Sequence, residues 1–298
     1  MEYLLWHKLL HQIHQIENTP RIKVIHLLQE LDDDAKTSAL NIVIKDKFMP
    51  IRRKALQILL RNDDNSLAKQ FLFDKHASIR IIAIAHLNKS NVDIQEIYCN
   101  SLTANNIFFI RCALWGLAEL NKNIPLIKDH LTSNYPSIRK QAINSFVKLV
   151  DSSNAKTELT NCLLDNSPAV CKESARLIDN LKISFIDDEL LQIIDKSKFI
   201  HTAISCIYIS KRLSKWERLI FLISLFEEQY LIKLDDIKLI QLSLKHWNMN
   251  FNRSFSQPNK QQLKVLEQKY NKFSKLLNTD EYKGIVFSLK SYGIYSNS

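Results

Sequence analysis

The sequence contains very little glycine and proline, with three glycines and six prolines among 298 residues. Tight turns, hairpins and phosphate-binding loops all depend on glycine, because it adopts backbone conformations that other residues avoid. The scarcity therefore argues against folds built on such loops. The chain is nevertheless 46% hydrophobic, which is enough to fold around a large core. We predict helices joined by short polar connections.

Long apolar runs and cysteine motifs are also missing. The longest apolar stretch, residues 219–226, has eight residues, far too few to span a bilayer. The opening MEYLLWHKLLHQIH lacks the basic segment and pure apolar run of a signal peptide. Five single cysteines without a C-x-x-C spacing fit reduced, buried thiols. We therefore expect a cytoplasmic protein that has no membrane partner.

The positive charge of the chain is unevenly distributed. The net charge is +10, and residues 211–298 hold 15 Lys and Arg against 8 Asp and Glu, an excess of 7. Residues 1–210 hold 26 against 23, an excess of only 3. An anionic partner is therefore one expectation for the last third of the chain.

Three segments repeat the pattern Ile-Arg-x-x-Ala: FMPIRRKALQ, HASIRIIAIA and YPSIRKQAIN. Taking the isoleucine as an anchor extends the series to six positions, with spacings of 28, 31, 28, 32 and 30 residues: Ile51, Ile79, Ile110, Ile138, Val170 and Ile200. Five residues before each anchor stands a hydrogen-bond acceptor suited to a turn or helix start: Asp46, Asp74, Asn105, Ser133, Asp165 and Asp195. Two amphipathic, helix-length patterns fill each period. A period near 30 built from two helices predicts an all-α fold of the α-solenoid type, since one helical hairpin cannot bury its apolar face alone.

The repeat resembles that of the HEAT-repeat family, including its short bacterial variety also found in phycobilin lyases. The resemblance rests on the pattern Asp-x-x-Pro-x-Val-Arg-x-x-Ala, best preserved in DNSPAV, SNYPSIRKQA, DKHASIRIIA and DKFMPIRRKA, and covers residues 20–210. It is specific for the fold and implies little about function, because such repeats serve many binding partners. In HEAT arrays the aspartate and arginine form a ladder between repeats. Here both members occur only in Asp46/Arg52 and Asp74/Arg80, while Cys171 and His201 replace arginine later, so an interrupted ladder is expected.

The period divides the chain into two predicted domains. Residues 1–210 form the repeat solenoid, with helices at residues 2–16 and 21–31 as a degenerate first repeat. After residue 209 the period fails, and residues 211–298 are predicted to form a divergent helical region packed on the end of the solenoid. Its expected helices span residues 214–228, 235–247, 257–277 and 282–292.

The helix that follows each anchor should present a groove. With the anchor and positions +4, +7 and +8 turned to the core, positions +2, +3 and +6 should face outward. The predicted partner-binding residues are Arg53, Lys54, Ile81, Ile82, Ala85, Lys140, Gln141, Asn144, Lys172 and Arg176; the same rule turns Gln57, Cys112, Ala113, Gly116 and Glu173 outward. The centre of this row is apolar or small and its flanks are basic, which favours a docking groove. Alternatively, curvature of the array buries Ile81 and Ile82 between neighbouring helices.

Signals of catalysis and metal binding are weak. No serine or cysteine triad, P-loop or dinucleotide fingerprint is recognisable. Paired carboxylates stand at expected helix starts, where they cap free N–H groups. His7, His11 and His14 share a helix face at a chelating spacing, but no acidic or cysteine ligand accompanies them. We predict no catalytic residue, no metal site and no cofactor.

One enzyme class stays open through the resemblance. HEAT-like DNA glycosylases hydrolyse alkylated bases with a concave aromatic and acidic cluster. Here Trp115 and Glu119 share the face of one helix, and Arg139 is offered by the next. Trp115 also stands beside the expected core residues Leu114 and Leu117, which favours a packing role.

Residues 245–261, KHWNMNFNRSFSQPNKQ, interleave aromatic and basic side chains without helical periodicity. Such a loop can stack on bases and contact phosphates. The candidate nucleic-acid contacts are Lys245, Trp247, Arg253, Phe255 and Lys260. In the alternative interpretation, the aromatic rings plug the end of the solenoid while the cations stay in solvent.

Taken together, the patterns predict a non-enzymatic scaffold that holds a protein partner in its concave groove, as an adaptor, an effector-neutralising protein or an immunity protein. The alternative is a nucleic-acid-binding protein, with a DNA alkylation-repair glycosylase as its extreme form.

Overall fold

The computed structural model describes Leu40 and residues 43–60, 65–234, 237–251, 254–277 and 282–294. All regular secondary structure in these residues is helical, so the predicted all-α class is confirmed for this part of the chain. The three candidate metal-binding histidines and the predicted helices 2–16 and 21–31 lie outside it. The chain forms two compact units, Met1–Asn123 and Ile124–Ser298.

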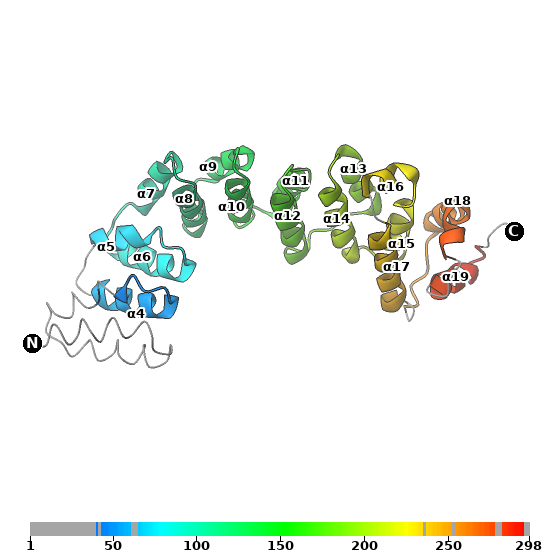
Figure 1. Ribbon diagram of the computed structural model, residues 1–298, viewed down its shortest axis with the longest axis horizontal. Helices are drawn as coiled ribbons and strands as arrows, with labels where there is room; N and C mark the ends of the chain where they lie inside the picture. The colour runs from blue at the N-terminus through cyan, green and yellow to red at the C-terminus, as the bar shows by residue number, and fades with distance from the viewer. Residues whose placement is uncertain are drawn as a thin grey trace, which may run out of the picture. The chain divides into compact units, whose positions relative to one another are not determined.

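The first unit contains five described helices: α4 (Met49–Leu59), α5 (Asn65–Phe71), α6 (Ala77–Lys89), α7 (Ile94–Leu102) and α8 (Ile107–Glu119). Helix α5 packs on α6 and α7 packs on α8, while α6 also contacts α4 and α7. These are the blue to blue-green helices of Figure 1. The pairs α5/α6 and α7/α8 thus each form a hairpin, as the period predicts.

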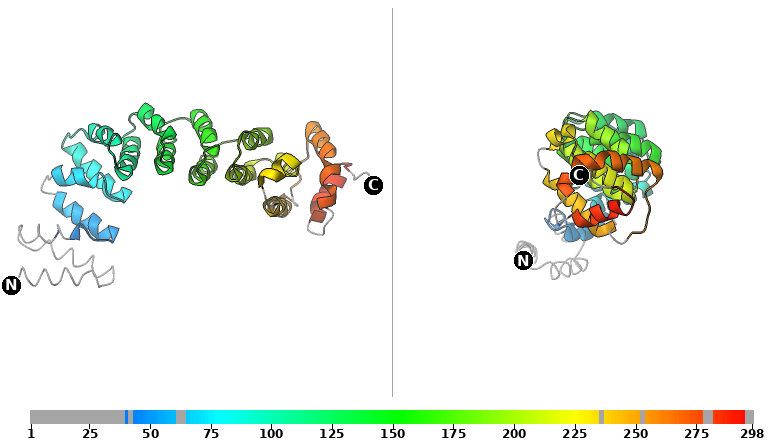
Figure 2. Two further views of the ribbon diagram at one scale, coloured as in Figure 1. Left: turned by 45° about the horizontal axis from the view of Figure 1, so that its top comes forward. Right: turned by 90° about the vertical axis from the view of Figure 1, so that its right-hand side faces the viewer.

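The second unit carries the later repeats and the C-terminal helices. Its elements are α9 (Ile124–Asp129), η3 (His130–Thr132), α10 (Pro136–Phe146), α11 (Ser152–Leu163), α12 (Pro168–Asn180), α13 (Asp187–Lys196), α14 (Ile200–Ile209), η4 (Ser210–Arg212), α15 (Lys215–Ser224), α16 (Glu228–Leu234), α17 (Lys238–Phe251), α18 (Lys260–Leu277) and α19 (Lys283–Lys290). Helix α12 packs between α10 and α14, and α9, α11 and α13 pack on α10, α12 and α14. The C-terminal helices continue from α15, which contacts α13, α17 and α18. In Figure 2 the helices of this unit, green to red, follow one another in chain order.

A recurring turn sets where the second helix of a pair begins. The carboxylate of Asp46 accepts a hydrogen bond from the backbone N–H of Phe48 at 2.7 Å, and Asp74 and Asp165 accept the equivalent bond at 2.7 Å. Ser133 and Ser197 accept it through their hydroxyl oxygens at 3.3 and 3.1 Å. A side-chain acceptor at this position fixes the turn and leaves the next residues free to start the helix. In α4, α10 and α12 a proline in the first turn adds a backbone already suited to a helix.

Buried arginines link one turn to the next. Arg52 donates to the carbonyl oxygen of Asp46 at 2.7 Å and reaches the Asp74 carboxylate at 3.1 Å. Arg139 binds both carboxylate oxygens of Asp165 at 2.7 Å. The arginine therefore pairs with the aspartate of the following repeat, and two such ladder rungs are present in the described residues.

The ladder changes partners elsewhere. Arg80 has no aspartate at the equivalent place and stacks on Trp115, with its guanidinium carbon 4.0 Å from the ring centroid. Where arginine is replaced, Cys171 donates to the carbonyl oxygen of Leu163, and His201 contacts that of Asp165 at 2.8 Å. Other contacts thus replace the arginine–aspartate pair at these positions, and the ladder is interrupted, as expected.

The structure corrects the predicted register of the third and sixth copies. Helix α10 begins two residues before its anchor Ile138, whereas α8 begins at Ile107 and α14 at Ile200. The equivalents of Ile138 are therefore Phe109 and Thr202, not Ile110 and Ile200. The acceptors also differ from those predicted: Asn106 caps α8 and Ser197 precedes α14, in place of Asn105 and Asp195.

The C-terminal helices also differ in their ends from the prediction. Helix α15 stops at Ser224 and α16 starts a new segment, while α17 continues to Phe251, four residues beyond its predicted end. Helix α18 begins at Lys260 instead of residue 257. The predicted domain boundary at residue 210 stays a prediction. None of the helices in the described residues is both long enough and apolar enough to cross a bilayer.

Candidate functional site

Helices α10, α12 and α14 form a cavity of about 590 Å³ in the second unit. Lys140 of α10, Lys172, Glu173 and Arg176 of α12, and Ile204 and Tyr208 of α14 are among its lining residues. These side chains occupy positions +2, +3 and +6 of successive copies once the register of α14 is corrected. Side chains from equivalent positions of three successive helices therefore contribute to the lining of the cavity.

An apolar stripe runs along α14, and two of its three side chains, Ile204 and Tyr208, line the cavity. Ile200, Ile204 and Tyr208 are four residues apart and are 42%, 44% and 43% exposed. A spacing of four keeps side chains on the same face of a helix. The predictions from the sequence include no outward residue on this helix, and the anchor Ile200, two residues too early, would not have pointed to Ile204 and Tyr208. The serine five residues before Thr202 is the signal that could have located them.

The facing wall is cationic and surrounds one carboxylate. Arg176 contacts Glu173 at 2.5 Å, and the ammonium group of Lys140 lies 3.5 Å from the same carboxylate. Burial alone would raise the pKa of Glu173, but hydrogen bonds from Arg176 and Asn144 and the charge of Lys140 together lower it. Lys172 is exposed and has no ion pair or hydrogen bond within the described part of the chain. The three cations therefore leave two positive charges uncompensated at this wall.

The far end of the stripe is held in place by Asp179. Its carboxylate accepts hydrogen bonds from the Tyr208 hydroxyl at 2.8 Å, from Lys211 at 2.7 Å and from Arg212 at 2.5 Å. Hydrogen bonds from Lys211, Tyr208 and Arg212 outweigh partial burial and lower the pKa of Asp179 to about 2. The Lys211 ammonium also lies 3.7 Å from the centroid of the Tyr208 ring. Tyr208 therefore presents a fixed aromatic ring to the cavity.

Position +3 is not an outward position. Glu173 and Cys112 are buried, and Lys54, Ile82 and Gln141 are half-buried. At this position the side chain lies at the edge of its helix, where the neighbouring helix covers it. The outward positions are +2 and +6.

The predicted residues of the first unit lie at the surface only in part. Arg53 and Ala85 are exposed, and Ile81 is 51% exposed. The prediction that Ala113 and Gly116 face outward, like that for Cys112, is wrong, because all three are buried in α8. In the corrected register, positions +2 and +6 of α8 are occupied by Arg111 and Trp115, each one residue earlier than predicted. The stacking of Trp115 on Arg80 supports the packing role over a glycosylase role.

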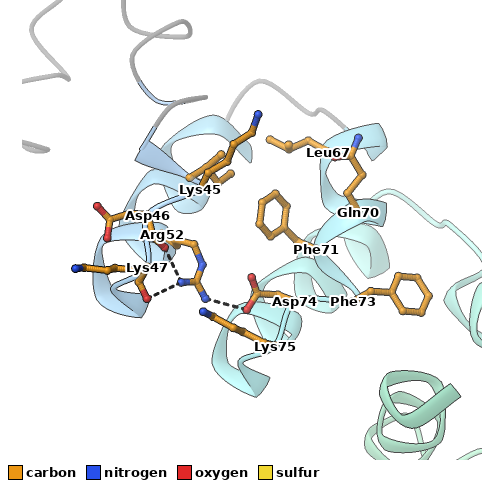
Figure 3. Close-up of a pocket in the computed structure, with 11 residues that line it drawn as sticks. Lys45, Asp46, Lys47, Arg52, Leu67, Gln70, Phe71, Phe73, Asp74 and Lys75 are labelled. Carbon is orange, nitrogen blue, oxygen red and sulfur yellow. Dashed lines mark hydrogen bonds and ion pairs between the residues drawn. The ribbon is translucent and has the colours of Figure 1, made fainter. Parts of the chain in front are cut away.

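A second cavity, of about 750 Å³, lies in the first unit beside the Arg52 rung. Figure 3 shows Arg52 pointing from α4 toward Asp74, with hydrogen bonds to the backbone oxygens of Asp46 and Lys47 and to the Asp74 carboxylate. The ring of Phe71 lies beside this network. Because Arg52 and Asp74 form an ion pair with each other, we assign them a structural role.

The candidate nucleic-acid segment is only partly a loop. Lys245 and Trp247 belong to α17, and Trp247 is 1% exposed, with its indole N–H donating to the Lys215 carbonyl oxygen at 2.6 Å. The prediction that Trp247 contacts nucleic acid is therefore wrong, since the ring fills the core. Phe255 is 98% exposed and Lys260 is exposed, whereas Arg253 lies outside the described residues.

Metal chemistry finds no support within the part of the chain that the structure describes, because no three His, Cys, Asp or Glu side chains gather there as ligands. No family model matches the sequence, and a comparison with the curated proteins finds no significant match.

Proposed function

We propose that this protein is a non-enzymatic binding scaffold, an α-solenoid of HEAT-like repeats that holds a protein partner in the cavity of α10, α12 and α14. The recurring turns, the arginine rungs between repeats and the hairpin packing support the solenoid. The observation that carries the function is the cavity itself, because side chains from equivalent positions of three successive copies converge on it.

The lining of the cavity suits a macromolecular partner. Three large apolar side chains, each more than 40% exposed, lie along nine residues of α14, and the first and last are about 12 Å apart along the helix axis. Their exposure to water is unfavourable unless a partner covers them. Cations border the stripe, which is the usual arrangement of an apolar centre with a polar rim. An adaptor, an effector-neutralising protein and an immunity protein would all use such a surface.

The test compares captured proteins between matched surface variants. Ile204→Glu places a charge in the apolar stripe, and Leu126→Glu makes the same change at a 39% exposed site on α9. Each protein is used to capture partners from the native host, followed by mass spectrometry and a thermal melt. We expect one protein to be lost with Ile204→Glu and kept with Leu126→Glu, at nearly unchanged melting temperature. Capture of the same proteins by both variants would contradict the proposal.

A nucleic-acid-binding function is the second candidate, and the exposure of Phe255, five residues before the exposed Lys260 in the sequence, favours it. A base can stack on a free ring while an ammonium group contacts its phosphate. Binding of this kind weakens steeply as salt rises, because counterions are released. The combined Phe255→Ala and Lys260→Ala variant should then lose affinity for single-stranded DNA in a fluorescence assay, whereas Ile204→Glu should not.

A further inference from the structure

We infer that the partner segment is an acidic amphipathic α-helix, which packs an apolar face on Ile200, Ile204 and Tyr208 and sets its carboxylates beside Lys172 and Arg176. This inference rests on the proposed function and specifies the ligand of the same cavity.

The apolar stripe fits a helix better than an extended strand. Its three side chains repeat every four residues along α14, so they form a ridge inclined by about 26° to the helix axis. A partner helix carrying apolar residues at i, i+4 and i+7 has a complementary ridge and groove. An extended peptide places its side chains on alternating faces, and only every second residue would meet the stripe.

Charge decides which amphipathic helix can bind. On the α12 side, three cations, Lys140, Lys172 and Arg176, accompany one carboxylate of the described cavity lining, that of Glu173. At the other end, two cations, Lys211 and Arg212, pair with the single carboxylate of Asp179. Both borders of the stripe therefore carry excess positive charge. A helix with glutamate or aspartate on its flanks gains attraction at both borders, whereas a basic helix is repelled.

Replacing Lys172 is the clearest test of this attraction. It is exposed and makes no ion pair or hydrogen bond within the described residues, so its replacement leaves no internal partner behind. Arg176 is a poorer choice, because it holds Glu173. Lys290 is an exposed lysine in the last turn of α19, outside the cavity, and gives a matched control.

The experiment uses three labelled synthetic peptides of about 18 residues, long enough to form a helix on binding. The first has leucines on one face and glutamates elsewhere. The second has lysines in place of the glutamates, and the third has serines in place of the leucines. Fluorescence anisotropy with the full-length protein should show the first peptide binding at least about tenfold more tightly than the other two.

The variants then locate the binding. Lys172→Glu should weaken the acidic peptide about fivefold or more and Ile204→Glu should abolish its binding, while Lys290→Glu should leave it unchanged. Equal affinity for the glutamate and lysine peptides, or an equal loss with Lys290→Glu, would overturn the inference. So would displacement of the peptide by single-stranded DNA in the wild-type protein.

Failure of this inference is distinguishable from failure of the proposed function. If Ile204→Glu still abolishes capture of a host protein but the acidic peptide does not bind, the scaffold stands and its ligand is of another kind. If Ile204→Glu changes neither measurement, both proposals fall.

Discussion

Tyr98 and Gly116 show how closely the first unit is packed at the level of single residues. Tyr98 is fully buried, and a Cβ atom built on Gly116 would lie 2.2 Å from its ring. The Tyr98 hydroxyl has no hydrogen-bond partner within the described residues, and burial raises the pKa of the phenol. The packing therefore requires the Tyr98 ring and a residue without a side chain at position 116. The Tyr98 hydroxyl contributes little to stability.

The variants Gly116→Ala and Tyr98→Phe separate these two effects. Alanine favours a helix over glycine by about 1 kcal/mol, yet here its methyl group would overlap the Tyr98 ring and force it to move. We expect a net loss of at least about 1 kcal/mol in the free energy of unfolding. Tyr98→Phe should change it by less than about 1 kcal/mol. Urea unfolding followed by circular dichroism measures both, and a stabilised Gly116→Ala variant would contradict the steric argument.

Arg218 is a buried cation that forms no ion pair within the described residues. Its side chain belongs to α15, the residue is only 7% exposed, and its Nε atom has no hydrogen-bond partner in the described residues. Burial lowers the pKa of its guanidinium group. Moving a charge out of water without pairing it is costly.

Replacing Arg218 with methionine should therefore leave the protein equally stable or raise the free energy of unfolding by about 1–2 kcal/mol. Methionine keeps a flexible apolar chain of similar length, so the packing is largely retained. A thermal melt and urea unfolding would show this. A large loss of stability would mean that the guanidinium group has a partner that stabilises the fold.

At the scale of elements, a buried arginine stabilises the fold where it pairs with a carboxylate of a neighbouring element. Arg139 connects α10 to the turn before α12, and the side chains of Arg139 and Asp165 are only 10% and 11% exposed. The hydrogen bonds that Arg139 donates to Asp165 raise the pKa of Arg139, against the effect of burial. Breaking one side of such a pair leaves a buried charge unpaired.

Arg139→Met should lower the free energy of unfolding by about 3–5 kcal/mol, in contrast to the same substitution at Arg218. Adding Asp165→Asn removes the stranded charge and should recover part of the loss. The two single variants and the double variant form a cycle that isolates the coupling. Equal effects of methionine at positions 139 and 218 would rule out the rung as a stabilising link.

Asp179 gives the pH dependence of the contact between α12 and η4. Hydrogen bonds from Lys211, Tyr208 and Arg212 lower its pKa from 3.8 to about 2. Because the folded pKa lies below the unfolded one, the contribution is fully present above pH 4 and is lost as the pH falls toward 2. Asp179→Asn should therefore be less stable than the wild type at pH 7, and the difference should shrink steadily below pH 4. A difference that stays constant with pH would refute this role.

At the scale of the whole molecule, the division into two compact units indicates which fragment of the chain can fold separately. The candidate site lies entirely in Ile124–Ser298. Asn121 and Asn123, just before it, have positive φ angles of 55° and 56°, the left-handed conformation of a turn. A cut at this place interrupts no helix. Repeats contact mainly their neighbours, so loss of the first unit should leave α10, α12 and α14 in place.

We expect the fragment of residues 124–298 to fold on its own, with a helical circular dichroism spectrum, a cooperative melt and nearly full affinity for the acidic peptide. An aggregated fragment, or one without a cooperative transition, would show that the second unit depends on the first.

Much of this architecture is determined by the sequence alone. Scarce glycine and a period near 30 residues suffice for an all-helical chain of hairpins, because local propensity and amphipathic spacing act within a few residues. Asp46, Asp74 and Asp165 could be assigned to turns for the same reason, since each bonds a backbone N–H only two residues away. The outward direction of Lys140, Lys172 and Arg176 likewise follows from helical periodicity.

Only the tertiary structure decided the rest. The row on α14 consists of Ile204 and Tyr208 because that helix starts where Ser197 forms its turn, and a recurring isoleucine could not show this. Arg139 and Arg218 are both buried arginines, yet only the fold shows that one has a carboxylate partner. Likewise, only the fold shows that Trp247 lies in the core. Periodicity assigns a side chain to a face of its own helix, but whether that face is buried depends on which helix packs against it.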